Sequence, residues 1–134
     1  MDDQMMRKLY ARYLLFMLAA CGGAFLWQFF LPQLAAGLSA WGTSFGWQRE
    51  IALWNTGIIL SAVIALKKKD LSYMRLLTIQ FTVLCWVLGL NHLAAAIENL
   101  PSLYPIHLLG VLEVMLLGGV WGSLLLFRTR SRPS

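Results

Sequence analysis

Six polar side chains lie in or beside the apolar stretches of this sequence and could do chemistry. They are two carboxylates, two amides and two imidazoles: Glu50, Glu113, Asn55, Asn91, His92 and His107. Imidazole and carboxylate groups can carry protons, ligate metals or form hydrogen bonds with a small molecule such as a quinone. Glu113, in "GVLEVMLLGG", lies deepest in an apolar stretch. An unpaired carboxylate there is costly, so it is a functional candidate by default.

The spacing of these residues matches no established metal or catalytic motif. The sequence has no HExxH, no histidine pair four residues apart and no CxxC. We therefore predict no metal site and assign no catalytic residue. Quinone and haem stay open as cofactors, because His92 and His107 could face each other from neighbouring helices. The structural alternative is a hydrogen-bond network that joins Glu50, Asn91, His92 and Glu113.

The composition predicts the elements that position these residues. The chain has 134 residues, of which 59% are hydrophobic and only 13% are charged. A soluble domain carries about 25% charged residues, so these values indicate a membrane protein. Apolar spans are predicted at about 13–31, 49–66, 71–97 and 106–127, each close to the ~20 residues that cross a bilayer. We expect residues 1–134 to form a single all-α, four-helix integral membrane domain.

The basic residues predict the orientation of the four spans. All lysines and arginines except Arg49 flank span one, the turn between spans two and three, or the end of span four: Arg7, Lys8, Arg12, Lys67, Lys68, Lys69, Arg75, Arg128, Arg130 and Arg132. The positive-inside rule then places both termini and this turn in the cytoplasm. The six candidate residues would all lie in the outward half. The net charge of +5 is explained by topology, and no basic stripe or motif predicts nucleic-acid binding.

The outward connection at 32–48 has an apolar pattern of its own. Leu31, Leu34, Leu38, Trp41 and Phe45 are spaced by three and four residues. This spacing predicts an apolar helical stripe that lies along the outer interface or caps the bundle.

The first span also contains a pattern typical of a lipoprotein signal. Leu18-Ala19-Ala20-Cys21 follows a basic start. The apolar run continues to Leu31, however, whereas a mature lipoprotein normally continues into a polar tether, so we expect this span to be retained. We interpret Cys21 and Cys85, both in apolar runs, as small buried side chains.

Small residues four apart predict where the helices pack, because they allow close approach of two backbones. Each span has such a face: Ala20 and Ala24; Gly57, Ser61 and Ala65; Cys85 and Gly89; Gly118 and Gly122. Glu50 shares its face of span two with Trp54 and Gly57, so we expect it to point toward the packing face.

The stretches "REIALWNTGIILSAVIALKKKD" and "LGLNHLAAAIEN" resemble the DoxX-like group of small four-helix bacterial membrane proteins. The resemblance covers residues 49–127, and Glu50, Asn55, Asn91 and His92 carry it. It implies a multi-pass protein of the inner membrane. Some members of the group are described as subunits associated with quinone-linked oxidoreductases, so it also implies other membrane subunits as partners beside the lipid bilayer. The small-residue faces of the spans could equally serve a partner subunit or a further copy of the chain.

Three functions follow as hypotheses. The first is an accessory or small-molecule-binding subunit of a membrane complex, quinone- or redox-linked, without enzymatic activity of its own. The second is a proton-coupled transporter of small molecules that depends on Glu113. Small multidrug transporters also have four spans, but their key glutamate lies in the first span, which has none here. The third is a membrane enzyme acting on a lipid or quinone, with His92 as acid or base and Glu50 or Glu113 setting its protonation.

Overall fold

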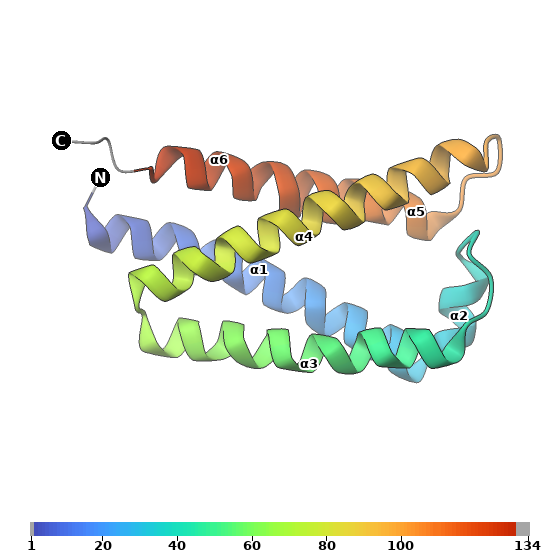
Figure 1. The fold of residues 1–134 in the computed structure, drawn as a ribbon, viewed down its shortest axis with the longest axis horizontal. Coiled ribbons are helices and arrows are strands. Elements are labelled where there is room, and N and C mark those ends of the chain that lie inside the picture. Colours follow the sequence, from blue (N-terminus) through green and yellow to red (C-terminus); the bar gives the residue numbers. More distant parts are fainter. Residues whose placement is uncertain (1, 131–134) are drawn as a thin grey trace.

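The computed structural model describes residues 2–130. It contains four helical stretches that are long and apolar enough to cross a membrane. They span Asp3–Phe30, Phe45–Lys68, Leu71–Glu98 and Pro105–Arg128. No strand occurs among the described residues. The structure therefore confirms the predicted all-α, four-helix membrane fold (Figure 1).

Local capping residues explain where the first three long helices begin and end. Helix α1 (Asp3–Phe30) begins well before the predicted span, because the Asp2 carboxylate accepts a hydrogen bond from the Met5 N–H at 2.6 Å. Helix α3 (Phe45–Lys68) is terminated by the next residue, Lys69, which adopts a left-handed conformation with φ 53°. Asp70 then caps α4 (Leu71–Glu98) through the Tyr73 N–H at 2.9 Å. Spans two and three are thus joined by a very short turn.

The fourth span consists of three consecutive helical segments. A short helix, α5 (Pro105–Leu109), leads into η1 (Gly110–Val120), which has the wider winding of a π-helix, and α6 (Trp121–Arg128) completes the span. π-Helical turns are rare and occur frequently at functional sites. This π-helical segment, which no pattern in the sequence predicts, carries Glu113.

The outward connection differs from the predicted continuous stripe. Helix α2 (Pro32–Gly37) covers only the start of it, and the stripe is broken before Phe45, with Gly42 at φ 71°. The buried side chains here are Ala35 and Ala36, whereas Leu34 and Trp41 are exposed. The Ile106 N–H donates to the Leu38 carbonyl at 3.3 Å, which ties this connection to the start of span four.

The start of α1, the turn at 69–70 and the end of α6 share one end of the molecule (Figure 1). We call it the basic end, after Arg7, Lys67, Lys68 and Arg128, and the opposite end, with His92 and His107, the histidine end. Which end faces the cytoplasm stays a prediction from the basic residues, of which Arg132 lies outside the described residues.

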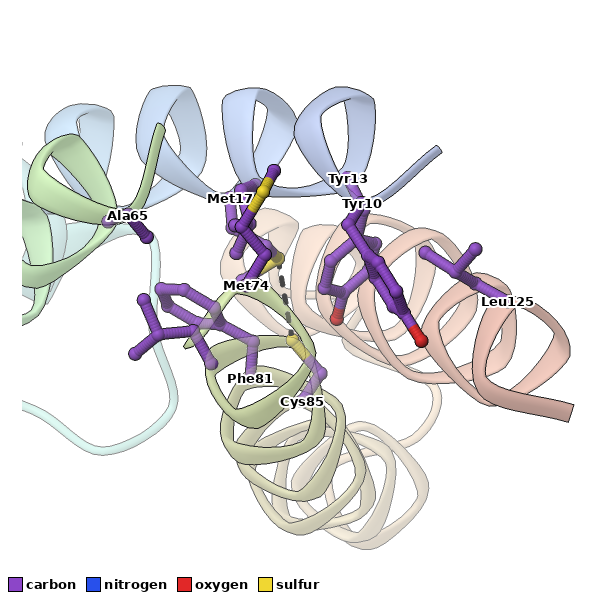
Figure 2. Packing of buried hydrophobic residues seen from close by; sticks show 11 residues of the cluster. Tyr10, Tyr13, Met17, Ala65, Met74, Phe81, Cys85 and Leu125 are labelled. Carbon is purple, nitrogen blue, oxygen red and sulfur yellow. Dashed lines mark hydrogen bonds between the residues drawn. The ribbon is translucent and has the colours of Figure 1, made fainter. Parts of the chain in front are cut away.

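The buried core lies mainly in the half of the bundle nearer the basic end. Figure 2 shows Tyr10, Tyr13, Met17, Met74 and Phe81 packed together between α1, α4 and the end of span four. The most extensive contacts join α4 to η1 and α1 to α3. Toward the histidine end, Figure 1 shows α1 approaching α3 while α4 runs beside α5. The bundle is therefore built from two helix pairs.

Glycines bring α4 and span four into close contact, as the spacing of small residues predicts. A Cβ atom added at Gly118 would meet Cys85, one at Gly122 would meet Thr82, and one at Gly89 would lie 2.8 Å from the Met115 Cα. The prediction that Gly57 lies on a packing face of span two is wrong, because Gly57 faces open space. Helix α3 instead buries three alanines, Ala52, Ala62 and Ala65, because it packs mainly on α1.

Candidate functional site at the histidine end

The two histidines meet at the histidine end of the bundle. His92 belongs to the last part of α4, and His107 belongs to α5, just after Pro105. Their Nδ1 atoms lie 3.1 Å apart, within hydrogen-bond distance. His107 is 1% exposed, whereas His92 is half-buried. The sequence places the two rings at similar depth, and the fold brings them into direct contact.

A backbone amide determines which ring nitrogens carry the protons. The Ala40 N–H donates to Nε2 of His107 at 3.1 Å, so Nε2 must present a lone pair. A neutral His107 then carries its proton on Nδ1 and donates it to Nδ1 of His92. The proton of neutral His92 is consequently on Nε2. The hydrogen bonds thus run in one direction, from Ala40 through His107 to His92.

The last donor in this chain has no acceptor in the protein. No hydrogen bond from Nε2 of His92 occurs within residues 2–130, and this nitrogen is not among the buried polar atoms without a partner. The His92 Nε2–H is therefore accessible and available to an acceptor from outside the chain.

Trp41 forms an aromatic wall beside the two imidazoles. Its ring centroid lies 4.9 Å from that of His92 and 4.6 Å from that of His107. Tyr104, in the connection between α4 and α5, also lies beside His107, with 6.1 Å between the two ring centroids. The Trp41 side chain is 53% exposed, so part of its surface can stack on a further flat group.

Gly110 makes room for the His92 ring. A Cβ atom at this position would meet the Cγ and Cδ2 atoms of His92. Because Gly110 is the first residue of η1, span four begins its π-helical segment at the point where the imidazole rests on its backbone. A side chain larger than glycine would displace the ring.

The other four candidate residues do not join this hydrogen-bond chain. Asn55 and Glu113 are half-buried, and the side chains of Glu50, Asn55, Asn91 and Glu113 form no hydrogen bond or ion pair within the described residues. The expectation that Glu50 points toward the packing face is wrong, because it is exposed, as are Trp54 (76%) and Gly57. Asn91 is also exposed, on α4. The proposed network through Glu50, Asn91, His92 and Glu113 is absent from residues 2–130.

Glu113 lies on η1, six residues after His107, and its side chain is half-buried. The η1 segment that carries it packs mainly on α4.

The contact between the histidines is poorly suited to haem or to a divalent metal. With metal–nitrogen bonds of about 2 Å, an iron between two opposed imidazoles would hold their nitrogens about 4 Å apart. The Ala40 N–H also keeps the proton of neutral His107 on Nδ1, the nitrogen that would have to bind a metal. Among residues 2–130, no group of three or more His, Cys, Asp and Glu side chains could hold a metal ion.

Two surface cavities lie at the basic end, away from the histidines. One has a volume of about 510 Å³ and is lined by Lys68, Asp70, Ser72, Tyr73 and Leu76. The other, about 230 Å³, lies where α1, α4 and the Thr129 region meet. Neither contains a residue of the predicted site.

Two contributors to the site, Trp41 and the Ala40 N–H, were not predicted from the sequence. The sequence signal for Trp41 was its position in an apolar stripe, which suggested contact with the membrane interface. No sequence signal identifies a backbone N–H as the partner of a histidine, because that contact depends on the path of the 38–44 connection.

No protein-family model, curated protein or solved structure gives a significant match to this chain. The resemblance to DoxX-like proteins over residues 49–127 therefore stays a prediction.

Proposed function

We propose that this small multi-pass membrane protein is a binding subunit that holds a flat, ring-shaped molecule with a hydrogen-bond acceptor, such as a quinone, at the histidine end. One observation carries the proposal: the Nε2–H of His92, oriented by the chain of hydrogen bonds from Ala40, has no acceptor within residues 2–130. A ligand carbonyl would accept this hydrogen bond.

The surroundings of His92 favour such a ligand over a charged one. Trp41 offers an exposed ring surface for stacking, and His107 and Tyr104 add aromatic groups without charge in their neutral forms. Ligand sites typically combine apolar and aromatic walls with a few oriented polar groups. A membrane-dissolved quinone ring has this combination of a flat apolar body and carbonyl acceptors.

The test is a titration of the purified protein in detergent with a short-chain quinone, followed by calorimetry. The His92→Phe variant keeps a flat ring but removes the donor. We expect it to weaken binding by about tenfold, since a buried hydrogen bond contributes roughly 1–1.5 kcal/mol. The matched control is Asn91→Ala, an exposed neighbour, which should bind as the wild type does. Equal binding by His92→Phe and the wild type would refute the proposal.

The role as a subunit of a larger membrane complex in the inner membrane is part of the same proposal. Its support is exposed polar side chains on helices that the single chain leaves without partners. Glu50 on α3 and Asn91 on α4 are exposed and form no side-chain hydrogen bond or ion pair among residues 2–130. Polar groups on helix surfaces in a membrane commonly contact other helices. Purification under mild conditions as a stable monomer, with no co-purifying protein, would count against this role.

A proton-coupled transporter is the second candidate, and Glu113 favours it. This half-buried carboxylate lies within a membrane span, in a π-helical segment, without a hydrogen bond or ion pair in the described residues. Ionisable groups in such positions commonly belong to proton pathways. In liposomes with an internal pH-sensitive dye, the wild type should then move protons and Glu113→Gln should not. Equal proton movement by both would exclude this function.

A further inference from the structure

The 38–44 connection is attached to the start of span four by two hydrogen bonds. The Ala40 N–H donates to Nε2 of His107 at 3.1 Å, and the Leu38 carbonyl accepts from the Ile106 N–H at 3.3 Å. Among residues 2–130, no other hydrogen bond joins this connection to α4 or to span four. One of its two attachments therefore depends on the protonation state of a histidine.

The contacts of the two rings fix how many protons the histidine pair holds. The Ala40 N–H requires a bare lone pair on Nε2 of His107. The two Nδ1 atoms, 3.1 Å apart, require a single proton between them. The remaining nitrogen, Nε2 of His92, holds the second proton. Both contacts are satisfied together only when the pair holds two ring protons, so that each ring is neutral.

A third proton has no place in this arrangement. On Nε2 of His107 it would face the Ala40 N–H, donor against donor. On Nδ1 of His92 it would face the Nδ1–H of His107, unless His107 moves its own proton to Nε2, where it again faces Ala40. Any uptake of a proton therefore breaks one of the two ring contacts.

The surroundings of the rings determine which contact gives way. His92 rests on the Gly110 backbone, and His107 is 1% exposed, so both rings are held in place. The connection is exposed from Trp41 to Ser44. The 38–44 connection is thus the part that can move when the donors oppose each other.

No charged side chain compensates a protonated ring in this position. The titratable groups beside His107 are His92 and Tyr104. The carboxylates on neighbouring elements, Glu98 on α4 and Glu113 on η1, form no hydrogen bond or ion pair with either ring within the described residues. The connection itself contains no charged residue. A buried charge without a partner is costly, so an imidazolium here is stabilised by water, which movement of the connection would admit.

We propose that the histidine pair is a pH-sensitive switch, in which uptake of one proton by His92 and His107 releases the Ala40 N–H and loosens the 38–44 connection. The proton comes from water, one N–H bond forms on a ring nitrogen, and no electron is transferred. The switch acts on the wall of the ring-binding site, because Trp41 follows Ala40. It does not depend on a bound ligand and is tested without one.

The experiment is hydrogen–deuterium exchange of the purified full-length protein in detergent, followed by mass spectrometry. Exchange of the 38–44 peptide is divided by its rate in the unfolded chain at the same pH, which gives a protection factor. Between about pH 8 and about pH 5, the range in which histidine titrates, we expect this factor to fall about tenfold. The internal control is the Lys69 N–H, which bonds to the Ala65 carbonyl at the opposite end and should stay equally protected. An unchanged factor for 38–44 overturns the proposal.

The matched variant is His107→Gln, whose side-chain carbonyl accepts the Ala40 N–H but does not titrate. We expect its 38–44 connection to be equally protected at both pH values. A pH response that survives in this variant places the switch elsewhere and refutes the proposal. If His107→Gln does not fold, ¹⁵N-histidine NMR of the wild type decides, since the chain has two histidines and hence two sets of ring signals. Ring protonation and loss of protection should share one midpoint, and different midpoints would overturn the proposal.

Discussion

The Tyr13 hydroxyl links span one to span four inside the bundle. Tyr13, which is fully buried, donates a hydrogen bond to the Gly118 carbonyl at 2.9 Å, and its oxygen lies 3.4 Å from that of Thr82. Gly118 belongs to the π-helical segment, where the usual pairing of backbone carbonyls is shifted. Since no water is available in a membrane to replace a lost partner, this side chain supports the unusual backbone of span four.

We expect Tyr13→Phe to destabilise the protein by about 1 kcal/mol, the net contribution of one hydrogen bond inside a membrane protein. The measurement is reversible unfolding in mixed micelles of mild detergent and SDS. Tyr73→Phe, at a position 37% exposed on α4, is the matched control and should have no measurable effect. Equal stability of Tyr13→Phe and the wild type would show that the hydroxyl is unimportant.

At the scale of single residues, the sequence predicted some of the candidate site and not the rest. The proximity of His92 and His107 followed from their depth on two consecutive spans. The inward orientation of Glu50 did not, because a helical wheel tells which residues share a face but not which face points inward. In a membrane, lipid and core are both apolar, so hydrophobicity does not distinguish the two.

Close contact between α4 and span four is the dominant packing feature among the elements. It depends on small residues at Gly89, Gly118 and Gly122, where an added Cβ would meet the opposite helix. Trp86 contributes a hydrogen bond across the same contact, from Nε1 to the Ser123 hydroxyl at 3.0 Å. Because lipid gives no hydrophobic driving force for pairing, this association depends on close packing.

Gly118→Ala should therefore destabilise the bundle by about 1–3 kcal/mol, the usual cost of overpacking. Its Cβ would meet both Sγ and Cβ of Cys85. Gly57→Ala makes the same change on α3 but meets nothing within 4 Å, so we expect unchanged or slightly raised stability. The same unfolding measurement compares the two variants. Equal effects would mean that the glycines act through helix propensity and not through contact.

The spacing of small residues predicted this contact, and the apolar lengths predicted the four spans. The sequence did not predict the π-helical winding of Gly110–Val120 or the end of α2 at Gly37. Both depend on tertiary contacts. The π-helical segment lies against His92 and Tyr13. Helix α2 is followed by a connection in which the Leu38 carbonyl accepts a hydrogen bond from the Ile106 N–H at the start of span four. Local propensity contains no information about such partners.

For the whole molecule, the basic residues predict which end of the bundle faces the cytoplasm, a property that the fold itself does not determine. We expect the basic end to face the cytoplasm. In a variant with Cys21 and Cys85 replaced by alanine, a cysteine at exposed Ser102 should react with a membrane-impermeant maleimide in intact spheroplasts. A cysteine at Ser72, near the turn at 69–70, should react only after the membrane is opened. The reverse pattern would contradict the positive-inside orientation.

The arrangement in two helix pairs has a consequence for how the protein is made. Helices α1 and α3 contact each other most extensively, as do α4 and η1, and the short turn at Lys69 separates the two pairs. Each pair is consecutive in the chain. The first can therefore leave the insertion machinery as a finished hairpin before the second is synthesised, and the core around Met17 and Phe81 can form when the two hairpins dock.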